Sequence, residues 1–141
     1  MLMLVKVIGA YGYAKDKHEY CSRNFLRQKA MTEIQKLRKQ LSRCLNVPFI
    51  EIIKPFNGNQ ILLLQQCIML GYIDQIGVRD ERTNSYRLMG EGNENEAYIH
   101  PSSCLFSKSP KYVVFGELLK TTKVYMKNLT MIPDALKMHF Q

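Results

Sequence analysis

The chain has 141 residues, enough for one domain, or for one domain and a fragment of a second. Hydrophobic residues make up 46% of it, so it can build a core and is not an intrinsically disordered chain. Its 20 Lys and Arg residues against 12 Asp and Glu residues give a net charge of +8. That charge suits a nucleic acid or an anionic membrane, and equally suits a basic surface that is merely soluble.

The apolar runs argue against secretion and against a membrane span. Residues 1–14 are apolar, but Lys6 interrupts them and no charged leader precedes them, so a signal peptide is not expected. The run 61–73 is too short to cross a bilayer and contains Gln65 and Gln66. We therefore expect a soluble intracellular protein with no membrane partner.

The cysteines are too far apart for a metal site. None lies in a C-x-x-C pair, and no histidine pair accompanies them, so no metal ligands are predicted and buried, reduced thiols are expected. The four are Cys21, Cys44, Cys67 and Cys104.

The first part of the chain has the periodicity of helices. A short helix is predicted from the apolar residues between Leu4 and Tyr11, ending in the polar turn 15–17. A longer one is predicted from Asn24 to Leu45, where apolar residues recur at steps of three and four. Its stripe consists of Leu26, Ala30, Ile34, Leu37, Leu41 and Leu45. The two helices together predict an N-terminal helical hairpin over residues 1–58.

A basic ridge lies opposite that stripe on the longer helix. It is formed by Lys29, Lys36, Lys39 and Arg43. Such a ridge is usually a solvated face, and it can also contact phosphates or dock an acidic partner, so both interpretations stay open.

The second part of the chain has the pattern of a small β-domain. A turn-rich linker at 54–59 is followed by a helix over 60–70, which Gly71 ends. Strands are predicted from Tyr72, around Tyr86 and around Tyr98, the last two separated by a mobile, acidic and glycine-rich connection over 89–96. Two more are predicted over 112–120 and 122–129. Five closely spaced strands suit a small antiparallel OB-fold barrel over residues 59–141, which makes the whole chain an α+β protein.

The segment His100-Pro101-Ser102-Ser103 predicts a rigid polar corner where a strand stops. Pro101 removes a backbone donor and keeps His100 extended, and the two hydroxyls can brace a turn, with His100 bonded to a backbone carbonyl. Cys104 follows, but no orienting acid and no glycine-flanked serine are present. No catalytic residue is predicted.

The strand near residue 124 carries the pattern of a nucleic-acid surface. In an extended conformation Lys123, Tyr125 and Lys127 share one face, so cations that can follow phosphates alternate with a ring on which a base can stack for about 1–3 kcal/mol. The alternative is a solvent-facing strand whose Tyr125 packs on a neighbour. The candidate nucleic-acid-binding residues are His100, Ser103, Lys108, Arg79, Arg87, Lys123, Tyr125 and Lys127.

These features resemble the C-terminal region of DEAH-box RNA helicases along nearly the whole chain. The barrel part is similar in Gly71-Tyr72-Ile73, in Gly77 and in Tyr86, and the polar corner is similar too. The string 25–34 resembles the end of the helical ratchet-type domain that precedes the barrel. That string and Gly71-Tyr72-Ile73-Asp74-Gln75 are most similar to the nucleolar ribosome-biogenesis branch, although spliceosomal relatives share the barrel motifs.

The resemblance implies an accessory module whose motor is missing. The chain has no G-x-x-x-x-G-K-[ST] loop and no D-E-A-H string, so we expect a fragment that does not hydrolyse ATP by itself and holds no cofactor. ATP and Mg would belong to the motor of the parent ATP-dependent RNA helicase.

Two functions are compatible with the resemblance. In the first, the module binds single-stranded RNA and couples it to the motor lobes during pre-ribosomal RNA processing in the nucleus, most specifically the nucleolus. In the second, it is a protein-interaction module that docks the motor lobes and an activating cofactor protein and has little RNA affinity.

Overall fold

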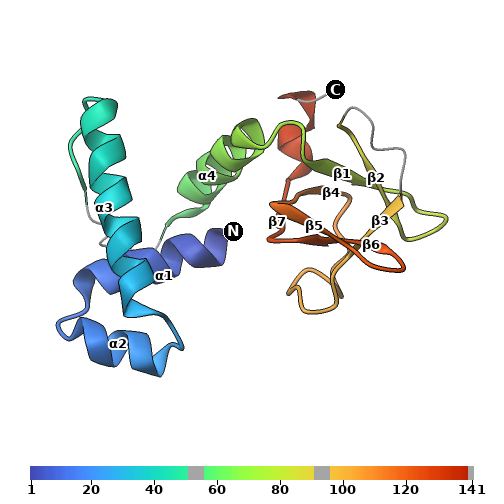
Figure 1. The fold of residues 1–141 in the computed structure, drawn as a ribbon. Helices are drawn as coiled ribbons and strands as arrows, with labels where there is room; N and C mark the ends of the chain where they lie inside the picture. Colours follow the sequence, from blue (N-terminus) through green and yellow to red (C-terminus); the bar gives the residue numbers. More distant parts are fainter. Residues whose placement is uncertain (51–55, 91–95, 140–141) are drawn as a thin grey trace. The chain divides into compact units, whose positions relative to one another are not determined.

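The computed structural model describes residues 1–50, 56–90 and 96–139. The chain divides into two compact units (Figure 1): residues Leu2–Pro55 form a helical unit, and Phe56–Gln141 together with Met1 form a barrel unit. The division falls three residues before the boundary expected from the sequence. Parts of the expected linker at 54–59 and of the expected mobile connection at 89–96 lie outside the described residues.

The helical unit has three described helices, so the predicted hairpin is wrong. They are α1 (Leu2–Tyr13), α2 (Lys17–Arg23) and α3 (Gln28–Cys44). The additional helix begins because Asp16 is an N-cap: its Oδ1 accepts a hydrogen bond of 2.8 Å from the Glu19 N–H. The longer helix begins at Gln28 and not at Asn24. Phe25 has a φ of 55°, which breaks the chain between α2 and α3.

The core of the helical unit is small. Tyr11, Cys21 and Met31, one from each helix, are buried together, with Val7, Ile8, Tyr20, Leu26 and Ile34 packed around them. The C-terminal half of the predicted stripe is not in this core: Leu37, Leu41 and Leu45 are 54%, 50% and 70% exposed. The segment after α3 packs instead on the Arg38 side, where the guanidinium lies 4.9 Å from the Phe49 ring centroid and donates to the Ile50 carbonyl.

The barrel unit begins with a well-capped helix. In α4 (Gly58–Gly71), the Asn57 side chain accepts from the Gln60 N–H at 2.9 Å, and the Gln60 side chain accepts from the Asn57 N–H at 3.0 Å. The strand predicted from Tyr72 begins only at Ile76. The reason is that the Tyr72 N–H bonds to carbonyls of α4 and the Gln75 N–H bonds to the Tyr72 carbonyl, so these residues close the helix.

The described strands form one mixed sheet of seven strands in the order β5-β6-β3-β2-β1-β4-β7 (Figure 1). The predicted five-stranded antiparallel arrangement is therefore wrong in both respects. The pair β3–β6 is parallel and the other pairs are antiparallel. The strands are β1 (Ile76–Arg79), β2 (Tyr86–Leu88), β3 (Glu96–Ile99), β4 (Tyr112–Val114), β5 (Glu117–Lys120), β6 (Val124–Lys127) and β7 (Thr130–Met131).

Two bends account for the extra strands. The predicted strand 112–120 is divided at Gly116. The predicted strand 122–129 stops at Asn128, whose φ is 55°, and β7 follows beyond its predicted end. The two bends face each other: a Cβ on Gly116 would lie 3.0 Å from the Asn128 Cβ, and the Gly116 N–H bonds to the Lys127 carbonyl. Because each bent strand pairs with different neighbours before and after its bend, the sheet curls into a barrel.

One apolar cluster fills the interior of the barrel. A second lies between the sheet and α4. The inner cluster consists of Tyr86, Leu88, Ala97, Ile99, Val113, Phe115, Met126 and Leu129. The cluster on the α4 side includes Met69, Ile76, Tyr112, Val114, Ile132 and Leu136. α4 is further tied to the sheet by the buried Gln65, whose Nε2 donates to the Met131 carbonyl at 2.9 Å.

Tyr86 and Arg79 fix the loop that follows β3. The Tyr86 hydroxyl donates to the Pro110 carbonyl at 2.6 Å, and Arg79 Nη1 donates to the Ser109 carbonyl at 2.8 Å. Burial raises the pKa of the Tyr86 phenol to about 12, although the nearby Arg79 guanidinium opposes the shift. Arg79 and Tyr86 thus hold the end of the 100–110 loop against β1 and β2.

The thiols are free, but the prediction that they are buried is wrong for three of them. Cys21 is buried in the helical core, whereas Cys44, Cys67 and Cys104 are exposed. Whether a cysteine faces solvent depends on how its unit packs. The spacing of cysteines along the sequence carries no information on that packing.

Gly77 is expected to be essential to barrel packing. A Cβ at this position would lie 3.1 Å from Met126 Sδ and 3.2 Å from Val113 Cγ2. We predict that Gly77→Val lowers the free energy of unfolding by about 1–3 kcal/mol in urea denaturation followed by tyrosine fluorescence. Gly71→Ala is the matched control, since a Cβ there meets nothing within 4 Å. Equal stability of Gly77→Val and wild type would contradict the packing argument.

Tyr86 is expected to make stability depend on alkaline pH. Because its pKa in the folded protein is about 12 and the ordinary value is 10, the protonated phenol stabilises the fold fully below pH 10, and this contribution is lost as the pH rises towards 12. We predict that Tyr86→Phe costs about 0.5–1.5 kcal/mol at pH 8, through the lost bond to Pro110, and that this cost shrinks between pH 10 and 12. Denaturation of both proteins across that range measures it, and a constant difference would refute the assignment.

Candidate nucleic-acid interface

The candidate site is the outer face of the sheet where β3, β6 and β5 lie side by side. Along β3 and β6, Ala97, Ile99 and Met126 point into the barrel core, so the alternate residues point outwards. We call this outward surface the β3–β6 face. It consists of Tyr98, His100, Lys123, Tyr125 and Lys127, bordered by Glu96 on β3 and by Glu117 and Leu119 on β5.

Three rings meet at the centre of this face. The parallel register places Tyr98 beside Tyr125, and their ring centroids are 6.4 Å apart with a tilt of 55°. The His100 ring lies 5.7 Å from the Tyr125 ring in an edge-to-face arrangement. All three residues are half-buried, so each ring packs against its neighbours and still has part of its surface exposed to solvent.

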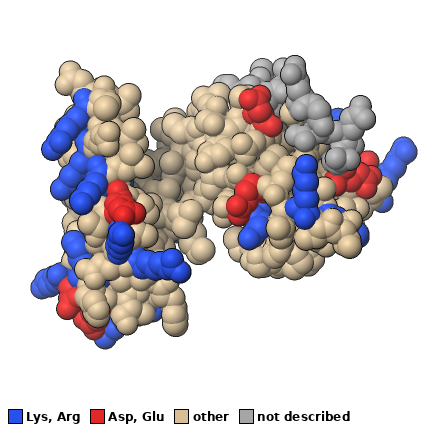
Figure 2. Space-filling view, in the orientation of Figure 1, with Lys and Arg blue, Asp and Glu red and all other residues tan. Residues whose placement is uncertain are grey.

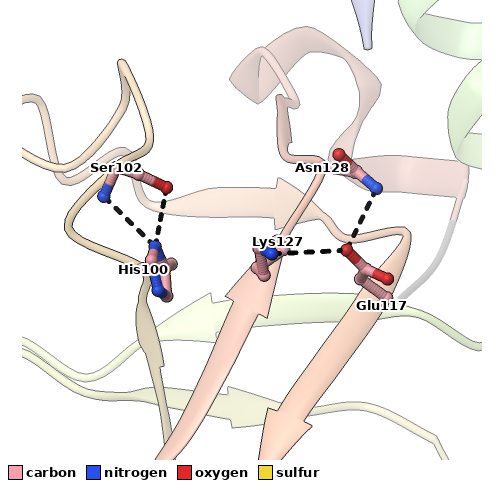
Figure 3. A network of polar contacts seen from close by, with 5 residues as sticks. All are labelled: His100, Ser102, Glu117, Lys127 and Asn128. Carbon is pink, nitrogen blue, oxygen red and sulfur yellow. Dashed lines mark hydrogen bonds and ion pairs between the residues drawn. The ribbon is translucent and has the colours of Figure 1, made fainter.

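Two lysines stand at opposite ends of the ring cluster. The Lys123 ammonium lies 4.6 Å from the Tyr98 ring centroid, a cation–π contact. Lys127 Nζ lies 3.8 Å from Glu117 Oε1, which also accepts from Asn128 Nδ2 at 3.4 Å (Figure 3). This ion pair is half-exposed, so it holds Lys127 only weakly and a phosphate could displace the carboxylate.

The polar corner predicted at residues 100–103 follows directly after β3. His100 Nδ1 lies 2.7 Å from Ser102 Oγ and accepts a bond of 3.2 Å from the Ser102 N–H (Figure 3). His100 is thus bonded to Ser102 and not to the backbone carbonyl expected from the sequence. Because Nδ1 accepts here, the neutral ring carries its proton on Nε2. Ser103 Oγ accepts from the Leu105 N–H, so this half-buried hydroxyl braces the turn.

The other predicted contacts are less closely grouped. Arg87 is exposed on β2, and its register partner is Glu96, so it borders the β3–β6 face. Lys108 is exposed in the loop after the corner. Arg79 is engaged with the Ser109 carbonyl and with Asn84 Oδ1, and its Nε is buried without a hydrogen-bond partner. Its geometry favours positioning the loop over contacting a ligand.

Sequence reasoning did not single out Tyr98, Leu119 or Glu117. Tyr98 lies on a predicted strand, and its alternation with Ala97 and Ile99 indicates an outward ring. The sequence does not indicate that Tyr98 lies beside Tyr125, because β3 and β6 pair in parallel and are separated by residues 100–123. Leu119 and Glu117 join the face through their pairing with Tyr125 and Lys127.

Charge is distributed differently on the two units. In Figure 2, Lys and Arg side chains crowd along the helical unit, whereas on the barrel unit they alternate with Asp and Glu. The predicted basic ridge on α3 is exposed at Lys29, Lys36, Lys39 and Arg43. Its role as a solvated face or as a phosphate contact stays a prediction.

Within residues 1–50, 56–90 and 96–139, no group of three or more His, Cys, Asp and Glu residues could hold a metal ion. Over the same ranges, no helix has the length and apolarity needed to cross a membrane.

Comparison with known proteins relates this geometry to a family. A family model described as the oligonucleotide/oligosaccharide-binding (OB)-fold matches residues 64–138, which contain all the described strands. The chain is 33% identical over 149 residues to the human protein named "Probable ATP-dependent RNA helicase DHX37". The alignment covers 94% of this chain and 12% of that protein.

Two further relatives carry similar names. The chain is 30% identical over 164 residues to "Probable ATP-dependent RNA helicase kurz" of Drosophila melanogaster, covering 98% of the chain and 14% of that protein. It is 30% identical over 135 residues to human "Probable ATP-dependent RNA helicase DHX35", covering 95% and 18%. The chain thus spans less than a fifth of the length of these relatives. It belongs to the OB-fold family that forms the C-terminal region of DEAH-box ATP-dependent RNA helicases.

Proposed function

We propose that this chain is an accessory module of a DEAH-box RNA helicase and binds single-stranded RNA through the β3–β6 face. The observation that carries the proposal is the arrangement of Lys123, Tyr125 and Lys127 on that face, with His100 against the Tyr125 ring. Cations spaced along a strand can follow the phosphates of an extended backbone, and rings between them can stack on unpaired bases. Ser103, Lys108 and Arg87 would extend the path at its edges.

The barrel would guide RNA and leave the chemistry to the rest of the protein. The relatives are named as ATP-dependent helicases, and this chain corresponds to only 12–18% of their length. The parent protein would accordingly be an ATP-dependent RNA helicase whose motor lobes hold ATP and Mg. In this arrangement the module holds RNA at the mouth of the motor's channel, so that translocation by the motor moves a strand that is already oriented.

The cellular setting follows from the resemblance to the ribosome-biogenesis branch. We infer that the parent protein processes pre-ribosomal RNA in the nucleus, within the nucleolus, and that an activating cofactor protein is a partner alongside the motor lobes. The string 25–34 in α3 and the loop before it supports this assignment. Spliceosomal helicases are the alternative setting.

A second function, protein docking, is favoured by one observation on the helical unit. Leu37, Leu41 and Leu45 form an exposed apolar stripe on α3 and its C-cap. Apolar surface of this kind is typical of protein contacts. The helical unit would then dock the motor lobes or a cofactor protein while contributing little to RNA affinity.

Salt dependence tests the RNA proposal. We predict that the full chain binds a single-stranded oligoribonucleotide with an affinity that falls steeply with salt, because lysines displace counterions from phosphates. Lys123→Gln and Lys127→Gln should each reduce the slope of log K against log salt concentration by about 0.7 in fluorescence anisotropy titrations. Lys15→Gln, an exposed lysine of the helical unit, is the charge-matched control and should leave the slope unchanged.

Two results would contradict the proposal. One is an RNA affinity that does not change with ionic strength. The other is an equal effect of all three substitutions, which would mean that the net charge of the chain, and not the β3–β6 face, attracts RNA.

A further inference from the structure

Tyr98 belongs to a feature of the β3–β6 face that the proposed phosphate path does not use. The sheet register aligns Tyr98 on β3, Tyr125 on β6 and Leu119 on β5 in one row across the outer face. Leu119 is 40% exposed, and both rings are half-buried. The three side chains therefore make an apolar shelf across the strands, with Lys123 and Lys127 on either side of it along β6.

We propose that this shelf is a stacking subsite for one unpaired nucleobase, and that Lys123 is a displaceable cap on the Tyr98 ring. The inference rests on the proposed RNA function and names the part of RNA that the face recognises. In the free protein the Lys123 ammonium occupies one face of the Tyr98 ring, 4.6 Å from its centroid. A base that stacks on Tyr98 takes that place and releases the ammonium to a phosphate.

The exchange is favourable because Tyr98 and Lys123 give up a weak contact with each other, and each gains a stronger contact with RNA. A cation–π contact at an exposed site is weak, since water competes for the ammonium. A nucleobase offers the ring a much larger apolar contact, and the released ammonium meets a charged phosphate at the same nucleotide. One lysine thus protects the ring in the absence of RNA and contacts the backbone in its presence.

The carboxylates around the shelf favour a base at its centre. Glu96 accepts a hydrogen bond of 3.3 Å from the Tyr98 hydroxyl, and Glu117 pairs with Lys127 at the other border. These carboxylates lie beside the two rings, so the middle of the shelf suits an uncharged base better than a phosphate. A duplex covers its base faces by internal stacking, so the shelf selects single strands.

Abasic RNA separates base recognition from backbone recognition. Two fluorescein-labelled oligoribonucleotides of equal length are titrated with the full chain, one normal and one with abasic residues along its length. Wild type should bind the normal strand more tightly. Tyr98→Leu, which keeps apolar bulk but removes the ring, should weaken binding of the normal strand roughly 5- to 100-fold and leave abasic binding within about twofold. Tyr98→Phe keeps the ring and should bind like wild type.

The cap is tested by NMR on the full chain. The ring current of Tyr98 should shift the Lys123 Hε resonances upfield in the free protein. The normal strand should remove that shift, and the abasic strand should leave it in place. Loss of the shift with the abasic strand would overturn the exchange, because a phosphate alone would then displace the ammonium.

The outcomes distinguish the inference from the function on which it rests. If wild type binds neither strand, the RNA function itself is wrong. If it binds both strands equally and Tyr98→Leu changes neither affinity, RNA binding stands and the stacking subsite is refuted. If Tyr98→Phe loses as much affinity as Tyr98→Leu, the hydroxyl bond to Glu96 and not the ring is what matters. Unchanged circular dichroism and thermal midpoints show that the variants are folded.

Discussion

The parallel pairing of β3 with β6 is the interaction on which the candidate site depends. It places the buried Ile99 against Met126 inside the barrel and, in the same register, Tyr98 beside Tyr125 outside it. The ladder continues past the strand end through the His100 N–H, which bonds to the Met126 carbonyl at 3.1 Å. A shift of one residue in this register would bury the rings and expose the core. Core packing therefore fixes the geometry of the outer surface.

The bends at Gly116 and Asn128 make this pairing possible. Each lets one continuous segment serve two neighbours, so the strands of 112–120 and 124–131 cross over and close the sheet. Closure leaves the interior filled by side chains of the inner cluster, with Gly77 providing the space that Met126 and Val113 require. Side chains of the described strands thus pack in the interior, and the candidate site lies on the outer face. Tyr86 and Arg79 then position the loop that leaves this face.

The two units differ in how much of their apolar surface they bury. The barrel unit buries two apolar clusters. The start of α4 is capped by the reciprocal hydrogen bonds of Asn57 and Gln60. The helical unit buries one side chain from each of three helices and leaves Leu37, Leu41 and Leu45 exposed. The barrel unit thus presents a preformed polar and aromatic face, while the helical unit leaves an apolar stripe exposed.

The sequence by itself determined that helices come first and strands later, the end of β3 at the polar corner, the helix predicted over 60–70, the shared face of Tyr125 and Lys127, and the family. These depend on local signals: periodicity, turn residues and the residue types at short spacings. The tertiary structure alone decided that the described strands number seven, that one pair is parallel, and that Tyr98 joins Tyr125. It also decided which side of α3 is buried. Those features follow from contacts between residues distant in sequence, and periodicity identifies an apolar face without identifying the neighbour that covers it.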